Sequence, residues 1–182
     1  MTLIVAVKDK NGHVYVGGDS VGSLDNFRIV RSDPKVFMKG PYVIGYTHSF
    51  RMGQIIRFSA TLPAPSGDPD KHMFKLAKIF SDTFSKEHFA TEYYNVRTGG
   101  RFIIGWKGHL YIIEPDFQFG RSPYGYLAAG SAFEVAYGAL HTTQDLKPLE
   151  RINMALSAGT EFNNGVGPPF IVCSTKDVKQ KK

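Results

Sequence analysis

The sequence contains a single cysteine, Cys173, in a chain of 182 residues. One cysteine cannot form an intramolecular disulfide, so a disulfide-stapled scaffold is excluded and a reducing compartment is favoured. Cys173 lies in the apolar run 170–173, which is typical of a small buried side chain rather than a reactive thiol. Nowhere do about 18 apolar residues follow one another, and the N-terminus carries neither a basic segment nor a long apolar one. We therefore expect a cytoplasmic protein without a membrane span.

Three further patterns are missing from the chain. The six histidines are not paired with cysteine or carboxylates at ligand spacing, so we expect no metal centre. No Gly-x-x-x-x-Gly-Lys-Ser/Thr segment is present, so the chain supplies no ATP-binding loop. The 22 lysines and arginines exceed the 16 aspartates and glutamates, but they cluster only in residues 176–182 and do not interleave with aromatic residues. We expect neither a cofactor nor a nucleic-acid partner.

The composition is that of an ordinary globular protein, with 42% hydrophobic and 21% charged residues. A chain of this length can bury one sizeable core, and no composition shift divides it. We therefore predict a single domain over residues 1–175, followed by a basic, solvated C-terminal tail at 176–182.

Apolar segments bounded by turn residues predict strands paired as hairpins, the clearest of which turns at Asn11-Gly12. A polar stretch, 21–34, separates the first two hairpins. The predicted strands are residues 2–7, 13–20, 35–38, 42–47, 101–106, 109–114, 124–129 and 170–174. Helical spacing predicts helices over 49–62, 70–89, 131–142 and 148–163, with Ser131 as the N-cap of the third through the capping box Ser131-Ala132-Phe133-Glu134.

This order of elements predicts the fold class. Hairpins occur in both halves, and two helices follow each set. The pattern favours an α+β, four-layer αββα sandwich, in which two antiparallel sheets pack face to face and helices cover both outer faces. A two-layer α+β fold would give almost the same pattern.

Thr2 follows the initiator methionine and begins the first predicted strand. If Met1 is removed, Thr2 carries a hydroxyl nucleophile and a free amine that acts as its own general base, as in threonine-type hydrolases. An α-amine has a pKa of about 7.7–8.0, and a nearby ammonium lowers it further. While Met1 is attached, the Thr2 nitrogen is an amide and this base does not exist. Threonine at position two is also common without any catalytic role.

Several segments, taken in order, resemble HslV peptidase and the proteasome β subunits, the threonine-type N-terminal nucleophile hydrolases. The sixteen positions from Asp19 to Lys35 match the family's spacing, and the resemblance extends to about Val172. The matching segments are Thr2-x-Ile4-Val5-Ala6-Val7, Gly17-Gly18-Asp19, Asp33-Pro34-Lys35-Val36, Val43-Ile44-Gly45-Tyr46 and Ala128-Ala129-Gly130-Ser131.

The resemblance implies a catalytic role for four residues. Thr2 is the nucleophile, and the Lys35 ammonium beside it favours the alkoxide. Asp19 keeps Lys35 charged and oriented, and an unpaired carboxylate at the end of an apolar strand would be costly. Ser131 relays a proton between the amine and the leaving group. Taken singly, Asp19 would be interpreted as a turn residue, Lys35 as an exposed edge lysine and Ser131 as a helix cap.

Two segments depart from the family's pattern. Where the family has a small Gly-rich turn, this chain has Thr47-His48-Ser49-Phe50, so a backbone amide of His48 or Ser49 is the candidate oxyanion donor. Asn163 and Val166 stand where the family commonly has Asp and Ser near the end of the last helix. The group of residues expected to support the nucleophile is therefore weakened, because it lacks a carboxylate and a hydroxyl.

The resemblance implies a threonine peptidase subunit that cleaves unfolded polypeptide in a homo-oligomeric ring, served by a separate AAA+ ATPase unfoldase. The departures motivate an alternative, a catalytically degenerate proteasome-like protein with a structural or assembly role. A third hypothesis is an amidase for a small-molecule amide, which would use the same nucleophile with a different pocket.

Overall fold

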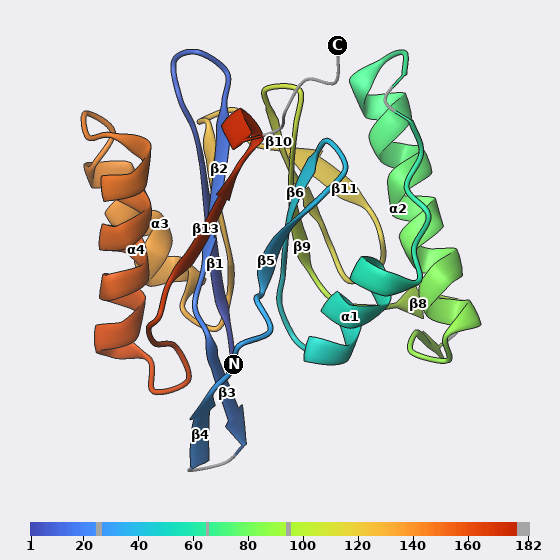
Figure 1. The fold of residues 1–182 in the computed structure, drawn as a ribbon, viewed down its shortest axis with the longest axis horizontal. Helices are drawn as coiled ribbons and strands as arrows, with labels where there is room; N and C mark the ends of the chain where they lie inside the picture. Colours follow the sequence, from blue (N-terminus) through green and yellow to red (C-terminus); the bar gives the residue numbers. More distant parts are fainter. Residues whose placement is uncertain (25–26, 65, 94–95, 178–182) are drawn as a thin grey trace.

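The computed structural model describes residues 1–24, 27–64, 66–93 and 96–177 (Figure 1). Residues 178–182, most of the predicted basic tail, lie outside the described residues. Two antiparallel sheets face each other. The first has the order β12 (Tyr126–Gly130), β1 (Leu3–Lys8), β2 (Val14–Gly18), β13 (Ile171–Ser174). The second has the order β11 (Phe119–Arg121), β10 (His109–Ile113), β9 (Phe102–Trp106), β6 (Tyr42–Tyr46), β5 (Val36–Lys39).

Helices cover the outer face of each of these sheets (Figure 1). The first sheet is covered by α3 (Phe133–Thr142) and α4 (Pro148–Phe162), and the second by α1 (Phe50–Phe58) and α2 (Pro69–Lys86). A short 3-10 helix, η1 (Thr175–Asp177), ends the described chain. The predicted four-layer αββα sandwich is thus confirmed, and the two-layer alternative is wrong.

Strand β1 shows why four layers form. Successive side chains of a strand point to opposite faces, so a strand buried on both faces is apolar at every position. Leu3, Val5 and Val7 pack against the helices of the first sheet, whereas Ile4 and Ala6 pack between the two sheets. All five are at most 1% exposed. The uninterrupted apolar run is therefore the signature of a strand with a layer on each side.

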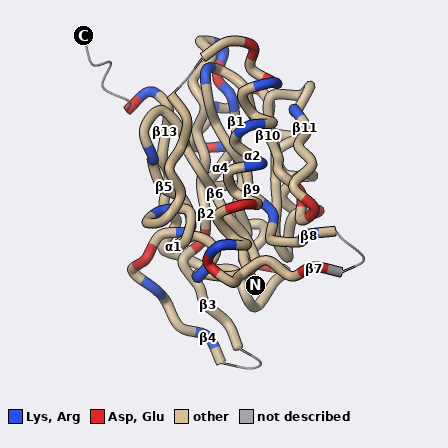
Figure 2. Tube along the Cα trace, turned by 90° about the vertical axis from the view of Figure 1, so that its right-hand side faces the viewer, with Lys and Arg blue, Asp and Glu red and all other residues tan. Residues whose placement is uncertain are grey.

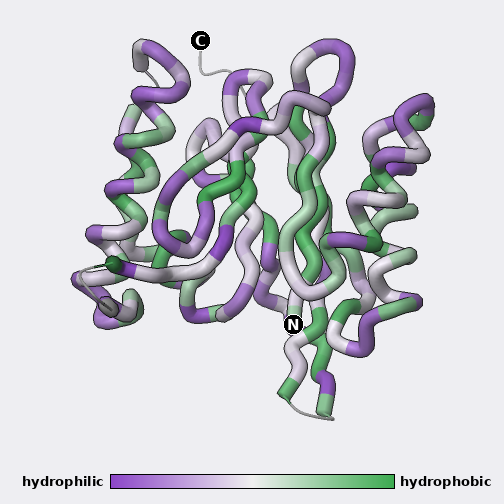
Figure 3. The backbone as a smooth tube through the Cα atoms, turned by 180° about the vertical axis from the view of Figure 1, so that it is seen from behind, coloured by the Kyte–Doolittle hydropathy of each residue, from purple (hydrophilic) through white to green (hydrophobic). Residues whose placement is uncertain are grey.

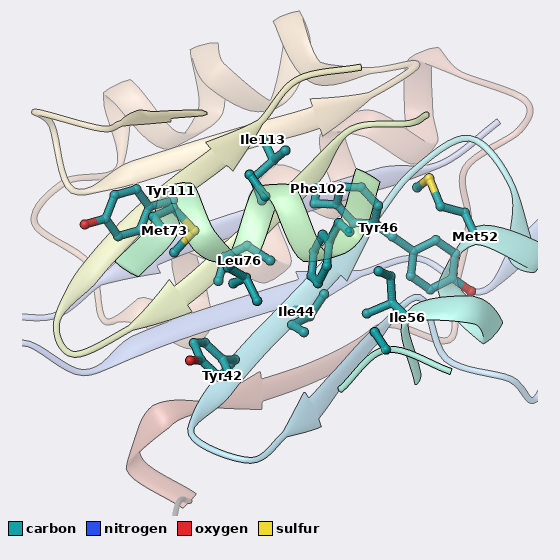
Figure 4. Close-up of a cluster of buried hydrophobic side chains, with 14 of the residues drawn as sticks. Tyr42, Ile44, Tyr46, Met52, Ile56, Met73, Leu76, Phe102, Tyr111 and Ile113 are labelled. Carbon is teal, nitrogen blue, oxygen red and sulfur yellow. The ribbon is translucent and has the colours of Figure 1, made fainter. Parts of the chain in front are cut away.

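A third cluster fills the space between the second sheet and its helices (Figure 4). Alternate residues of β6 point into it, and Met52 and Ile56 of α1 and Leu76 of α2 meet them there. Figure 3 shows the same pattern along the whole chain, with hydrophobic residues concentrated in the central strands and hydrophilic ones in the connections.

The stretch 21–34, predicted to be polar and without strands, contains a two-stranded hairpin. Strands β3 (Val21–Leu24) and β4 (Phe27–Val30) pair in antiparallel register and project from the end of the sandwich where the N-terminus lies (Figure 1). Every residue of β4 is exposed and Val21 is the one buried residue of β3, so neither strand shows the alternation that would reveal it in the sequence. The prediction missed β7 (Thr91–Tyr93), β8 (Val96–Thr98) and β11 as well, because three residues are too few to show a period.

None of the described helices combines the length and hydropathy that a membrane span requires. Basic and acidic residues are interspersed along the tube in Figure 2.

Candidate active site

The pairing of β1 with β12 fixes the backbone of Thr2. Leu3 is in register with Gly130, and the Ser131 N–H donates to the Thr2 carbonyl at 2.8 Å. Gly130 has a φ of 115°, and a Cβ at this position would overlap the Thr2 carbonyl oxygen. Only glycine combines this backbone conformation with so close an approach. Thr2 itself is 5% exposed, and its carbonyl is held by the Ser131 N–H.

Asp19 and Lys35 form a buried ion pair beside the first residues of the chain. Lys35 Nζ donates to Asp19 Oδ1 at 2.9 Å, and both side chains are at most 1% exposed. The other contacts of the carboxylate are backbone donors: the Leu3 N–H at 2.9 Å to Oδ1 and the Val21 N–H at 3.0 Å to Oδ2. Asp19 therefore ties together β1, the start of β3 and Lys35. Asp19 is therefore more than a turn residue, and Lys35 is not an exposed edge lysine.

The electrostatics of this corner lower the pKa of an amine at the start of the chain. Burial lowers the pKa of the Lys35 ammonium, and the Asp19 carboxylate opposes that shift. Burial and, next, the charge of Lys35 lower the pKa of the terminal amine on Met1, while Asp19 raises it. A positive charge held close to the start of the chain disfavours a second one there.

Met1 precedes Thr2 in the structure and occupies the same corner. The Thr2 hydroxyl donates to the Met1 carbonyl at 2.7 Å, and Lys35 Nζ approaches the same oxygen at 3.4 Å. The Met1 ammonium donates to Ser23 Oγ at 3.0 Å. The Thr2 hydroxyl and the Lys35 ammonium thus lie close to the same carbonyl oxygen, which brings the two side chains together at the start of the chain.

The loop after β6 contains the two predicted oxyanion donors, the amides of His48 and Ser49. Thr47 is anchored by donating to the Arg101 carbonyl at 3.0 Å, and Ser49 donates its N–H back to Thr47 at 3.0 Å. The Ser49 amide, one of the two predicted donors, is therefore engaged, and the Ser49 hydroxyl caps α1. Within the described residues the His48 amide makes no hydrogen bond. His48 has a φ of 77°, the left-handed conformation that favours glycine.

The structure corrects the predicted helix cap at Ser131. Helix α3 begins at Phe133 with Ala132 as its N-cap, and no side chain caps it. Ser131 instead extends the contact of β12 with Thr2. Its hydroxyl makes long hydrogen bonds, 3.4 Å to the Thr2 carbonyl and 3.5 Å to Asn163 Oδ1. Because the Ser131 hydroxyl is directed toward Thr2 and Asn163, it does not cap the first turn of α3.

Asn163 joins two loops at the site without carrying charge. Its Nδ2 donates to the Ser131 carbonyl at 3.1 Å, and its Oδ1 accepts from the Gly165 N–H at 3.0 Å. Val166 is fully buried and packs in the cluster beneath α3 and α4. The amide keeps the loops together, whereas Val166 contributes to the core and not to the polar contacts around Thr2.

A cavity of about 240 Å³ opens beside Thr2. Its walls are the β3–β4 hairpin, the end of β6 at Tyr46, the loop at His48 and the start of α1 at Phe50. Sequence reasoning missed Arg31, Tyr46 and Phe50 as site residues, because the hairpin that brings Arg31 to the cavity was not predicted. In the ranges that the structure describes, no group of three or more His, Cys, Asp or Glu could hold a metal ion.

Solved structures similar to this chain share its fold over nearly its whole length. Thiobacillus denitrificans BPH in complex with epoxomicin has a TM-score of 0.82 at 14% identity and covers 95% of this chain and 97% of its own. Another structure of T. denitrificans BPH has a TM-score of 0.81 at 16% identity, with coverages of 96% and 97%. Eukaryotic HslV from Trypanosoma brucei has a TM-score of 0.70 at 16% identity, with coverages of 95% and 98%.

These likenesses show the class of the fold, which this chain shares with the solved structures of BPH and HslV. More particularly, the chain has the HslV/proteasome-like fold, and the resemblance inferred from its sequence is confirmed at that level. No protein-family model and no curated protein matches the chain.

Proposed function

We propose that the protein is a threonine peptidase subunit of the HslV/proteasome-like type, activated when removal of Met1 makes Thr2 the N-terminal residue. The observation that carries this proposal is the buried Asp19–Lys35 ion pair packed against the start of β1. Burying two charges is expensive, and a structural role is met as well by apolar residues of similar volume. The buried Lys35 ammonium lies beside the Thr2 hydroxyl and the amine at the start of the chain. At that place it favours the alkoxide of Thr2 and lowers the pKa of the amine.

The geometry supports a mechanism through an acyl-enzyme. The Thr2 amine accepts the hydroxyl proton, and Oγ1 attacks the carbonyl carbon of the peptide. Lys35 stabilises the developing negative charge on Oγ1, and the His48 N–H faces the oxyanion. When the C–N bond breaks, the protonated amine returns its proton to the leaving nitrogen, with Ser131 as a relay. Water, deprotonated by the same amine, then hydrolyses the ester and restores Thr2.

The fold likeness also supports an assembly. HslV is one of the similar structures, so we propose a homo-oligomeric ring that takes unfolded polypeptide from a separate AAA+ ATPase in the cytoplasm. Ring formation is checked by the mass of the purified protein in solution, where a monomer of 20.2 kDa would contradict it.

Peptide hydrolysis together with intact-mass measurement tests the activity. Protein whose mass shows loss of Met1 should cleave an unfolded polypeptide or a fluorogenic peptide. Thr2→Ala should abolish cleavage, and Thr2→Ser, the matched control, should retain part of it because it keeps the hydroxyl. Cleavage that persists in Thr2→Ala, or with Met1 retained, would contradict the proposal.

A second candidate is a catalytically degenerate relative with a structural or assembly role. It is favoured by the engaged Ser49 amide, by a bulky side chain at His48 in a left-handed conformation, and by the neutral Asn163. Assembly without hydrolysis by protein that has lost Met1 would support it. Turnover of a small amide without peptide cleavage would instead support the amidase hypothesis.

A further inference from the structure

The polar groups of Met1 are all bonded within the fold. The Met1 carbonyl accepts from the Thr2 hydroxyl at 2.7 Å and from Lys35 Nζ at 3.4 Å. At the other end of the residue, the Met1 ammonium donates to Ser23 Oγ on β3 at 3.0 Å. An enzyme that removes Met1 has to bind the same amine and the same carbonyl, so it competes with these contacts.

The side chain of Met1 rests on the turn that follows α4. A Cβ at Gly165 would lie 2.6 Å from Met1 Cε and 2.8 Å from Met1 Sδ, so a side chain there would displace the methionine. Asn163 holds this turn, because its Oδ1 accepts from the Gly165 N–H at 3.0 Å and its Nδ2 donates to the Ser131 carbonyl at 3.1 Å. Met1 is 52% exposed, so part of its side chain is covered by the turn and part faces water.

The residues after Met1 are far less accessible. Thr2 is 5% exposed and Leu3 is fully buried. The Thr2 carbonyl accepts from the Ser131 N–H at 2.8 Å, and the Leu3 N–H donates to Asp19 Oδ1 at 2.9 Å. Strand β1 lies between β12 and β2, so it is not at a free edge of its sheet. Drawing Thr2 out of the fold breaks these bonds and exposes Leu3 to water, which costs free energy.

These contacts bear directly on hydrolysis of the bond between Met1 and Thr2. A peptidase holds the residues on both sides of the bond that it cuts, so a bond within a folded domain is cleaved through local opening, at a rate that follows the population of the open form. In the hydrolysis itself water adds to the Met1 carbonyl carbon and the C–N bond breaks. Free methionine leaves with the new carboxyl group, and the Thr2 nitrogen takes up a proton and becomes the amine.

We propose that folding locks Met1 in place, so that a methionine aminopeptidase removes it only from a chain whose first residues have not yet docked. A chain that folds before this cleavage keeps Met1 and stays without the amine base of Thr2. The inference rests on the proposed function, which requires the free amine, and it adds the step at which activity is decided: cleavage of the chain before β1 enters its sheet.

Intact-mass measurement of Met1 loss tests the proposal without any assay of peptide hydrolysis. Folded full-length protein that begins at Met1, released from an N-terminal fusion partner, is incubated with purified methionine aminopeptidase. A synthetic peptide of residues 1–4 is the unfolded reference substrate. We expect the folded protein to lose methionine about a hundredfold or more slowly than the peptide. Similar rates would overturn the proposal, and so would loss of Met1 from the folded protein in buffer alone.

Two variants connect the protection to its residues. Ser23→Ala removes the partner of the Met1 ammonium, and Asn163→Ala removes the hydrogen bonds that hold the turn beneath the Met1 side chain. Each should speed methionine loss from the folded protein several-fold. Ser81→Ala on α2, the matched control, changes another half-buried serine outside this corner and should leave the rate unchanged. Unchanged rates in both Ser23→Ala and Asn163→Ala would overturn the proposal.

The order of folding and cleavage is tested in growing cells. Protein that accumulates while methionine aminopeptidase is inhibited should keep Met1 after the inhibitor is removed, whereas protein synthesised afterwards, marked with heavy isotopes, should begin at Thr2. Loss of Met1 from the older protein, or its retention in the newer protein, would overturn the proposal. If protein that begins at Thr2 cleaves no peptide, the proposed function fails, while these mass measurements still decide whether folding protects Met1.

Discussion

Two groups of polar residues contact the start of β1, and they differ in burial and charge. Asp19 and Lys35 are charged, at most 1% exposed and joined at 2.9 Å. Ser131 and Asn163 are neutral, lie nearer the surface and meet through contacts of 3.1–3.5 Å. A buried ion pair tolerates no change in one partner, whereas long, neutral contacts at the surface do. The buried pair matches the residues that the resemblance implies, whereas in the outer group Ser131 matches them and Asn163 departs from them.

The largest effect is expected from breaking the buried pair. Asp19→Ala leaves the Lys35 ammonium without its partner and removes the acceptor of two backbone amides, so we predict a loss of about 3–5 kcal/mol in the free energy of unfolding. Urea denaturation measures this. Asp82→Ala, which breaks an exposed pair with Arg97, is the control and should cost less than about 1 kcal/mol. Similar losses in the two variants would show that burial does not distinguish these pairs.

The second largest effect is expected from disturbing the contact between β12 and Thr2. Gly130→Ala forces a Cβ against the Thr2 carbonyl at a left-handed φ, so we predict a loss of roughly 2 kcal/mol or more. Gly138→Ala in α3, where a Cβ meets nothing within 4 Å, should instead gain about 0.5–1 kcal/mol. Thermal unfolding of the two variants gives the comparison. A stable Gly130→Ala protein would mean that the backbone around Thr2 can shift.

The outer group should affect turnover more than stability. Ser131 is exposed and its hydroxyl makes only long hydrogen bonds, so Ser131→Ala should change the free energy of unfolding by less than about 1 kcal/mol. If Ser131 relays the proton to the leaving group, kcat should fall about tenfold or more. Unchanged kcat would remove Ser131 from the mechanism.

The smallest predicted effect concerns pH. Asn163→Asp places a negative charge near Thr2, which stabilises the protonated amine and raises its pKa. Because the free amine is the base, activity rises as pH passes through that pKa, and the variant's rising limb should move to higher pH by roughly half a unit. A pH profile of kcat/KM measures the shift. A shift to lower pH would contradict the role of the amine.

Sequence reasoning recovered the layered fold because hairpins occur in both halves and two helices follow each set. The pairing of Asp19 with Lys35 was implied by the resemblance to HslV and the proteasome β subunits, and the structure shows it. The β3–β4 hairpin was not predictable, since the side chains of β4 are all exposed and those of β3 show no alternation of buried and exposed positions. Arg31 and Phe50 were not predicted as site residues for the same reason, because their contact depends on how the hairpin folds back toward α1. The capping box at Ser131 was misleading because the Ser131 hydroxyl makes tertiary contacts with the Thr2 carbonyl and Asn163 in place of the first turn of α3. The choice between His48 and Ser49 required the loop's hydrogen bonds.

The proposed nucleophile is tested most directly by intact-mass measurement after incubation with epoxomicin, the ligand in one of the similar structures. For protein that begins at Thr2, we predict one epoxomicin adduct per chain located on Thr2, and no adduct on Thr2→Ala. Protein that begins at Thr2 and stays unlabelled, or equal labelling of Thr2→Ala, would contradict the assignment of Thr2 as the nucleophile.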